Sequence, residues 1–152
     1  MLQAGDVLVM VGDLGAGKTT FTQGLGAGLG VGEPITSPTF TLHRQYEGDS
    51  LALHHLDLYR LGRISDAEDL DLGSLVESAG IVVIEWGDLV APLLADGYLR
   101  LRFELRSAGS AEGHSDDDRV VAFEPVGDRW AARRKLLADL ADRFAENRPP
   151  PC

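Results

Sequence analysis

The sequence predicts an α/β domain built on a mixed β-sheet. Two uninterrupted apolar runs, at residues 7–11 and 80–84, each end in polar residues or glycine. Such runs are typical of strands buried on both faces of a parallel sheet. A glycine-rich segment with helical character follows the first run, and alternating segments at 39–59 and 98–127 predict an antiparallel portion. This combination is typical of an α/β domain with antiparallel strands added to a parallel sheet.

The first strand leads into a helix that is expected to begin near Lys18 and to end about Gly30, a candidate C-cap. Each glycine inside this helix costs roughly 1 kcal/mol of helix stability relative to alanine. Packing must therefore hold the helix, and its small residues would allow a close approach to the sheet. The interior glycines are Gly24, Gly26 and Gly28. Pro34 and Pro38 then predict a loop.

The middle of the chain predicts a hairpin, short helices and a second buried strand. Residues 39–47 and 50–59 flank a Gly-Asp turn, which indicates an antiparallel hairpin. Ser65 is a candidate N-cap for short helices over 65–78. The second apolar run follows, and Pro92 interrupts a short helix after it.

The last third predicts two strands, at 98–106 and 119–127, joined by a polar loop, and then one helix over 128–147. Apolar residues at helical spacing support that helix. A length of 152 residues suits one hydrophobic core. We therefore expect a single domain over 1–147, with 148–152 as a flexible tail.

Composition excludes several classes of function. The net charge is −10, from 14 basic and 24 acidic residues. This charge disfavours sequence-independent binding to the phosphate backbone of a nucleic acid. Basic residues between Arg129 and Arg143 are interpreted as a solvated helix face, with a docking patch for an acidic partner as the alternative. No apolar run approaches the roughly 18 residues of a membrane span, and no signal-peptide core is present. We expect a cytoplasmic protein without membrane contact; its one cysteine, Cys152, has no partner for a disulfide or a metal pair.

A phosphate-binding loop is the strongest motif in the chain. It matches G-x-x-x-x-G-K-[ST] in full and consists of Gly12, Asp13, Leu14, Gly15, Ala16, Gly17, Lys18 and Thr19. Glycines let the backbone wrap closely, so that N–H groups point at phosphate oxygens next to a helix N-terminus. Lys18 is expected to reach the β- and γ-phosphates, and the Thr19 hydroxyl to ligate Mg²⁺. The motif predicts a P-loop NTPase-like three-layer domain that binds a nucleoside triphosphate.

Two acids at strand ends could complete this site. Asp57 ends the second strand of the hairpin, and Glu85 ends the second apolar run. Acids just past buried strands are where α/β sites form, so both are predicted to enter the site as metal-shell and catalytic groups, together with Lys18. In the alternative, one of them only forms a salt bridge, with Arg60 as a candidate partner. With period two, His55, Asp57 and Tyr59 share one face.

Two threonines are weaker candidates. Thr39 lies on the loop after the first helix, where a switch threonine would sense the γ-phosphate; a threonine at a strand start is the alternative. Thr20 is also a nucleotide-binding candidate. The favoured interpretation, however, is that Thr20 is a helix residue whose side chain faces solvent or a neighbouring strand. His43, His54 and His114 show no convergent partners and are interpreted as surface or core residues.

Three classes of protein carry such a phosphate-binding loop. A GTP-specific switch would need an N-K-x-D element, and the only asparagine is Asn147. A small-molecule kinase would need an acceptor pocket and usually an arginine-bearing lid. A small ATPase that serves a partner protein requires only the residues already named. A nucleotide-dependent binding module and a small-molecule kinase stay open as alternatives.

Four ordered blocks resemble the TsaE family, whose members are bacterial ATPases of tRNA threonylcarbamoyladenosine biosynthesis. The blocks are "GDLGAGKTTF", "TSPTFTL", "HLDLYRL" and "VIEWGD", spread over residues 12–88. The resemblance implies ATP with Mg²⁺, a switch-like segment at Ser37 to Thr39, an aspartate near the metal at Asp57, and a glutamate important for hydrolysis at Glu85, followed by Trp86. Taken with the loop motif and the two strand-end acids, the candidate metal ligands are Thr19, Asp57 and Glu85.

The resemblance also implies partners. TsaB and TsaD carry out the threonylcarbamoyl transfer, and proteins similar to TsaE bind that pair and hydrolyse ATP to support turnover. The acidity of the chain fits an indirect route to tRNA. Family members usually have a few tens of residues, forming a strand and a helix, before the loop strand. The present chain is expected to lack them, through truncation or a misassigned start, so that the loop strand would lack a neighbour and the adenine contacts would be incomplete.

Overall fold

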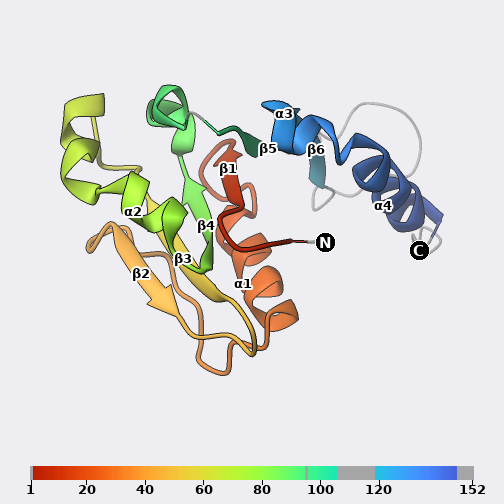
Figure 1. Cartoon of the computed structure of the whole chain (residues 1–152), viewed down its shortest axis with the longest axis horizontal. Coiled ribbons are helices and arrows are strands. Elements are labelled where there is room, and N and C mark those ends of the chain that lie inside the picture. Colours follow the sequence, from red (N-terminus) through yellow and green to blue (C-terminus); the bar gives the residue numbers. More distant parts are fainter. Residues whose placement is uncertain (1, 95, 106–118, 147–152) are drawn as a thin grey trace.

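In the computed structural model, six strands of the described residues form one mixed sheet in the order β2-β3-β4-β1-β5-β6 (Figure 1). The strands are β1 (Val7–Val11), β2 (His43–Tyr46), β3 (Ala52–Asp57), β4 (Gly80–Glu85), β5 (Tyr98–Leu105) and β6 (Arg119–Val126). The structure describes residues 2–94, 96–105 and 119–146, so the expected polar loop, His114 and the expected tail lie outside the described residues. The mixed sheet confirms the predicted fold class.

Strand β1 lies in the interior of the sheet and is paired on both sides. It runs parallel to β4 and to β5, while the outer pairs β2–β3 and β5–β6 are antiparallel. The expectation that the strand before the phosphate-binding loop lacks a neighbour is therefore wrong. The missing partner comes from late in the sequence, because β5 returns parallel to β1.

Helical segments cover both faces of the sheet and give three layers (Figure 1). They are α1 (Lys18–Gly28), η1 (Ile64–Leu70), α2 (Leu72–Glu77), η2 (Gly87–Leu89), η3 (Ala91–Leu93), α3 (Asp128–Ala131) and α4 (Arg134–Glu146). One core packs strand residues such as Met10 and Leu101 with Phe21 and Leu25 of α1 and Trp130 of α3. The other core, on the opposite face, contains residues of η1, α2 and η3. Within the described residues, none of the helices has the length and apolar content needed to cross a bilayer.

Two helix predictions need correction. Ser65 lies inside η1 rather than capping a helix; Asp71 caps α2 instead, with its carboxylate accepting from the Ser74 N–H. The expected single terminal helix is divided into α3 and α4. The break adjoins the residues that hold Asp6, because Arg129 of α3 and Arg133 of the intervening turn both reach its carboxylate.

The contact with Asp6 also revises the interpretation of the basic segment. Asp6 is fully buried just before β1, and its two oxygens lie 3.0 Å from Arg129 and 2.7 Å from Arg133. These two arginines therefore neutralise a buried acid and do not belong to a solvated face or a docking patch. Arg134, Lys135 and Arg143 are exposed on α4, as expected.

Among the interior glycines of α1, only Gly26 is required to be small. A Cβ at Gly26 would collide with Ile35, whereas a Cβ at Gly24 would meet no atom within 4 Å. We expect Gly24→Ala to raise the free energy of unfolding by about 1 kcal/mol, because alanine favours the helix. Gly26→Ala should lower it by about 1–3 kcal/mol through overpacking. Paired denaturant titrations measure both changes, and a stabilising Gly26→Ala would refute the tight packing of Gly26 against Ile35.

Candidate functional site

The candidate site lies at the carboxyl ends of three parallel strands. β1 leads directly into the loop at Gly12, β3 ends at Asp57, and β4 ends at Glu85. Asp57 and Glu85 are register partners on neighbouring strands, and Glu85 is likewise the partner of Met10. Both predicted acids are buried, at 4% and 3% exposure. Adjacent carboxyl ends explain why two acids that are 28 positions apart in sequence meet.

The loop that follows β1 adopts a backbone that its glycines allow. Gly12, Gly15 and Gly17 have φ angles of 141°, 80° and 104°. A Cβ at Gly12 would also lie only 2.5 Å from the Phe103 carbonyl oxygen of β5. Positions Gly15 and Gly17 face open space, because a Cβ there would meet nothing within 4 Å. The loop is thus closed toward the sheet at its start and open along its middle.

Lys18 is held at the centre of the loop. Its Nζ donates to the carbonyl oxygens of Gly12 at 2.7 Å and Asp13 at 2.8 Å, and it lies 3.9 Å from the centroid of a Trp86 ring. Lys18 is only 4% exposed. Burial lowers the pKa of its ammonium, while the charges of Glu85, Asp57 and Asp13 act in the opposite direction. The ammonium is therefore fixed in place next to both strand-end acids.

Thr19 and His55 both contact Glu85. The Thr19 hydroxyl donates to Glu85 Oε1 at 2.8 Å, and His55 Nε2 lies 2.9 Å from the same oxygen. Thr19 lies in the first turn of α1, and its hydroxyl reaches the end of β4 through this contact. The sequence placed His55 on the same strand face as Asp57 but did not assign it to the site. Its partner comes from another strand, and no pattern within the chain encodes that register.

The loop before β2 meets Asp57. The hydroxyl groups of Ser37 and Thr39 both donate to Asp57 Oδ2, and the Thr39 hydrogen bond is 2.7 Å long. The two hydroxyl oxygens lie 2.6 Å apart. Asp57 Oδ1 accepts from the Tyr59 N–H at 3.0 Å. Arg60, the alternative salt-bridge partner, lies over the Phe40 ring instead, 4.1 Å from its centroid. The structure thus brings the switch-like segment against one of the two acids.

These groups line one cleft of about 360 Å³. Its lining residues are Leu14, Gly15, Gly17, Lys18, Thr19, Thr20, Ser37, Thr39, Asp57, Tyr59, Glu85 and Trp86. Thr20 is exposed at this cleft, which is consistent with both interpretations of that residue. Ala16 is buried in the core, while Gly12 and Asp13 take part through their carbonyl oxygens. The roles assigned to these residues from sequence stay predictions.

The cleft offers oxygen ligands for a cation rather than a preformed cage. Among the described residues, no three His, Cys, Asp or Glu side chains converge on a point that could hold a metal ion. The lining of the cleft does contain two carboxylates and five hydroxyl groups, those of Thr19, Thr20, Ser37, Thr39 and Tyr59. Such hard oxygen donors suit Mg²⁺, which usually keeps water and takes one or two carboxylates together with substrate phosphates.

His43 and His54 are partnered, contrary to the expectation from sequence. Their rings stack with centroids 5.4 Å apart, and His43 Nε2 lies 3.2 Å from His54 Nδ1. Ser78, the C-cap residue of α2, contacts this pair because its Oγ lies 3.0 Å from His54 Nε2. The same hydroxyl donates to the Leu75 carbonyl oxygen. Burial is the main cause of a lowered pKa for both imidazoles. The cluster links β2, β3 and α2 and is separate from the cleft.

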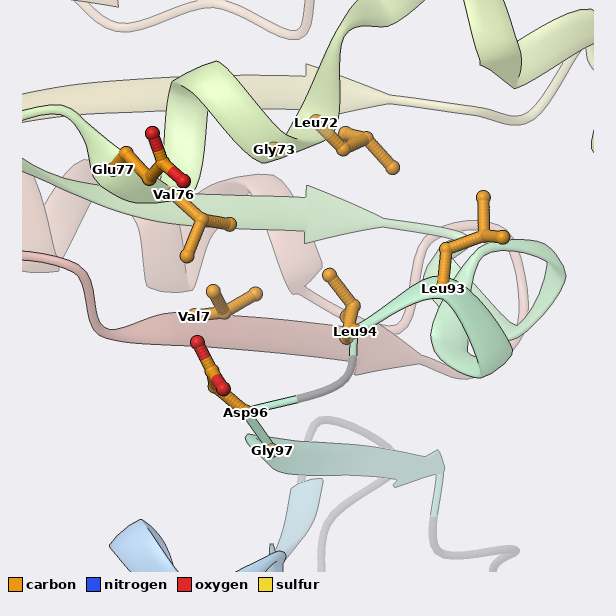
Figure 2. A pocket seen from close by; sticks show the side chains of 9 residues that line it. All are labelled: Val7, Leu72, Gly73, Val76, Glu77, Leu93, Leu94, Asp96 and Gly97. Atoms are coloured by element: carbon orange, nitrogen blue, oxygen red, sulfur yellow. The ribbon is translucent and has the colours of Figure 1, made fainter.

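A second cavity lies by the amino end of β1, away from the phosphate-binding loop. It has a volume of about 160 Å³, and Figure 2 shows Val7, Leu72, Val76, Leu93 and Leu94 around it. The only charged side chains of its lining are the acids Glu77 and Asp96. A cavity with apolar walls and carboxylates repels phosphate, so the cleft at the other end of β1 is the candidate site.

The fold and the loop define a P-loop NTPase-like α/β domain. The sequence model of the family "Threonylcarbamoyl adenosine biosynthesis protein TsaE" matches residues 1–112. The chain belongs to the TsaE family, whose role lies in tRNA threonylcarbamoyladenosine biosynthesis. The resemblance seen in the four sequence blocks is thereby confirmed.

Individual relatives agree with this assignment. The tRNA threonylcarbamoyladenosine biosynthesis protein TsaE of Streptomyces coelicolor is 45% identical, over 86% of this chain and 87% of that protein. The protein of the same name from Bacillus subtilis is 40% identical, over 83% of this chain and 73% of its own length. The crystal structure of Bacillus subtilis YdiB superposes with a TM-score of 0.71 at 31% identity, covering 92% of this chain and 81% of that one.

Proposed function

We propose that this chain binds ATP with Mg²⁺ in the cleft at the phosphate-binding loop and hydrolyses it. We further propose that the hydrolysis supports tRNA threonylcarbamoyladenosine modification together with TsaB and TsaD. The observation that carries the proposal is the convergence of Lys18, Thr19, Asp57 and Glu85 on one cleft, from three parallel strand ends. Those are the residue types that phosphate transfer to water requires.

The residues present suit the ligand. The open middle of the loop, at Gly15 and Gly17, leaves room for phosphate oxygens against backbone N–H groups. The ammonium of Lys18 currently binds two loop carbonyls and is the group that would turn to the β- and γ-phosphates. The Thr19 hydroxyl and the Asp57 carboxylate are the groups that would hold Mg²⁺.

Bound Mg²⁺ would supply charge neutralisation at the phosphates. Ser37 and Thr39 hold the Asp57 carboxylate in one orientation, and Thr19 holds that of Glu85. Glu85 would then orient the attacking water and receive its proton on a carboxylate oxygen. Trp86 packs against both the Lys18 ammonium and the Tyr59 ring, and so covers one wall of the cleft.

The net charge of −10 supports an indirect route to tRNA through the partner proteins. An assay with ATP labelled on the γ-phosphate tests the catalytic part, with and without TsaB and TsaD and with and without a chelator. Label in inorganic phosphate that disappears with the chelator is the expected result. Label on an added metabolite would identify a kinase, and tight binding without consumption would identify a binding module. A pull-down of TsaB and TsaD, with and without ATP, tests the partners.

A further inference from the structure

His55 is an unusual residue for its position. It is fully buried in β3, its Nε2 lies 2.9 Å from Glu85 Oε1, and Nδ1 is buried with no hydrogen-bond partner among the described residues. A leucine or phenylalanine would fill this space without burying an unsatisfied nitrogen. The contact with Glu85 therefore accounts for an imidazole at this position.

The unpaired Nδ1 of His55 indicates which atom is the donor in the hydrogen bond between His55 Nε2 and Glu85 Oε1. A hydrogen on Nδ1 would be a buried donor without an acceptor, and Nε2 would then present a lone pair to a carboxylate oxygen. A hydrogen on Nε2 avoids both costs, because Nε2 then donates to Glu85 Oε1. Thr19 donates to the same oxygen. Within the described part of the chain, Glu85 Oε2 makes no hydrogen bond, so Oε2 is the oxygen left for a water in the cleft.

We propose that His55 is a positioning residue: its Nε2–H and the Thr19 hydroxyl together clamp Oε1 of Glu85 and fix the direction of the other carboxylate oxygen. This inference rests on the proposed hydrolysis for its catalytic consequence, but the clamp itself is a property of the protein alone. His55 touches no reacting atom. It acts through Glu85, as the partners behind metal-binding side chains do.

The test uses two variants of the whole chain that separate the hydrogen bond from the packing. His55→Gln places an amide N–H near the position of Nε2, whereas His55→Phe keeps the bulk and removes the donor. We expect His55→Phe to lower kcat by about 10–100-fold, in the range found when outer-shell partners are lost, with ATP affinity kept within about threefold. His55→Gln should retain kcat within about threefold. In a Glu85→Gln background, His55→Phe should cause no further loss, since the two residues act as one unit.

Two measurements do not depend on hydrolysis. The ¹⁵N spectrum of the wild-type imidazole should show the hydrogen on Nε2, and crystal structures should show the Glu85 carboxylate displaced in His55→Phe but retained in His55→Gln. A hydrogen on Nδ1, an unmoved carboxylate in His55→Phe, or equal loss of kcat in both variants would overturn the proposal. If the wild-type protein consumes no ATP, the proposed function fails, and the tautomer and carboxylate position still decide the clamp. If His55→Phe does not fold, the tautomer and the kcat of His55→Gln decide it.

Discussion

Replacing Lys18 with alanine is expected to weaken ATP binding by about a hundredfold or more. The residue is 4% exposed, and its ammonium is aimed at the loop by the Gly12 and Asp13 carbonyls. Hydrogen bonds to charged groups contribute about 1.5–3 kcal/mol each, and each 1.4 kcal/mol is tenfold in affinity. Losing the contacts to two phosphates therefore costs about 3 kcal/mol or more, which corresponds to at least two tenfold losses of affinity. Isothermal titration with ATP and Mg²⁺ measures the change.

The chain provides a matched control for this substitution, because its only other lysine is Lys135. Lys135 is exposed on α4, and the described lining of the cleft contains no residue of that helix. Lys135→Ala removes the same charge and should leave ATP affinity unchanged within about twofold, since a screened surface charge contributes little at a distance. Thermal unfolding of both variants checks that the fold persists. Wild-type affinity in a folded Lys18→Ala protein would refute the assignment of the phosphate-binding loop.

Local patterns predicted those parts of the site that depend on one segment at a time. The spacing from Gly12 to Thr19 fixes a loop between a strand and a helix, and the structure has that arrangement. Asp57 and Glu85 were predicted because each ends a predicted strand, Asp57 the second strand of the hairpin and Glu85 the second apolar run. Parallel strands place their carboxyl ends at the same edge, so no knowledge of register was needed to bring these acids together.

Features that need the pairing between distant segments were not predicted. Asp6 is held by Arg129 and Arg133, more than 120 residues later, and nothing in the local sequence of either partner marks the contact. The parallel pairing of β5 with β1 was not predicted for the same reason. The alternation of residues 98–105 predicts a half-exposed strand, and Phe103 is indeed buried between the exposed Arg102 and Glu104. The alternation does not encode which strand lies beside β5.

Glu85→Gln is expected to separate hydrolysis from binding. The amide keeps the shape of the side chain, and its oxygen can still accept from the Thr19 hydroxyl and from His55, as Oε1 does now at 2.8 and 2.9 Å. What is lost is a negative charge and a proton acceptor. General base catalysis contributes about 10²–10⁴-fold, so turnover should fall by that range. The loop groups proposed to contact the phosphates do not include Glu85, so ATP affinity should stay within a few-fold.

The control is Glu104→Gln, which makes the same chemical change at an exposed position of β5 and should alter neither quantity. Single-turnover hydrolysis and equilibrium binding, measured on both variants with TsaB and TsaD present, distinguish the roles open to Glu85. Unchanged turnover would remove it from the mechanism. A parallel loss of Mg²⁺-dependent ATP binding would instead make Glu85 chiefly a metal-shell residue, leaving Asp57 as the acid closest to the water. Asp57 is less suited to orienting the water, because Ser37, Thr39 and the Tyr59 N–H already occupy both its oxygens. Among the residues that the structure describes, Glu85 is held through Oε1 only.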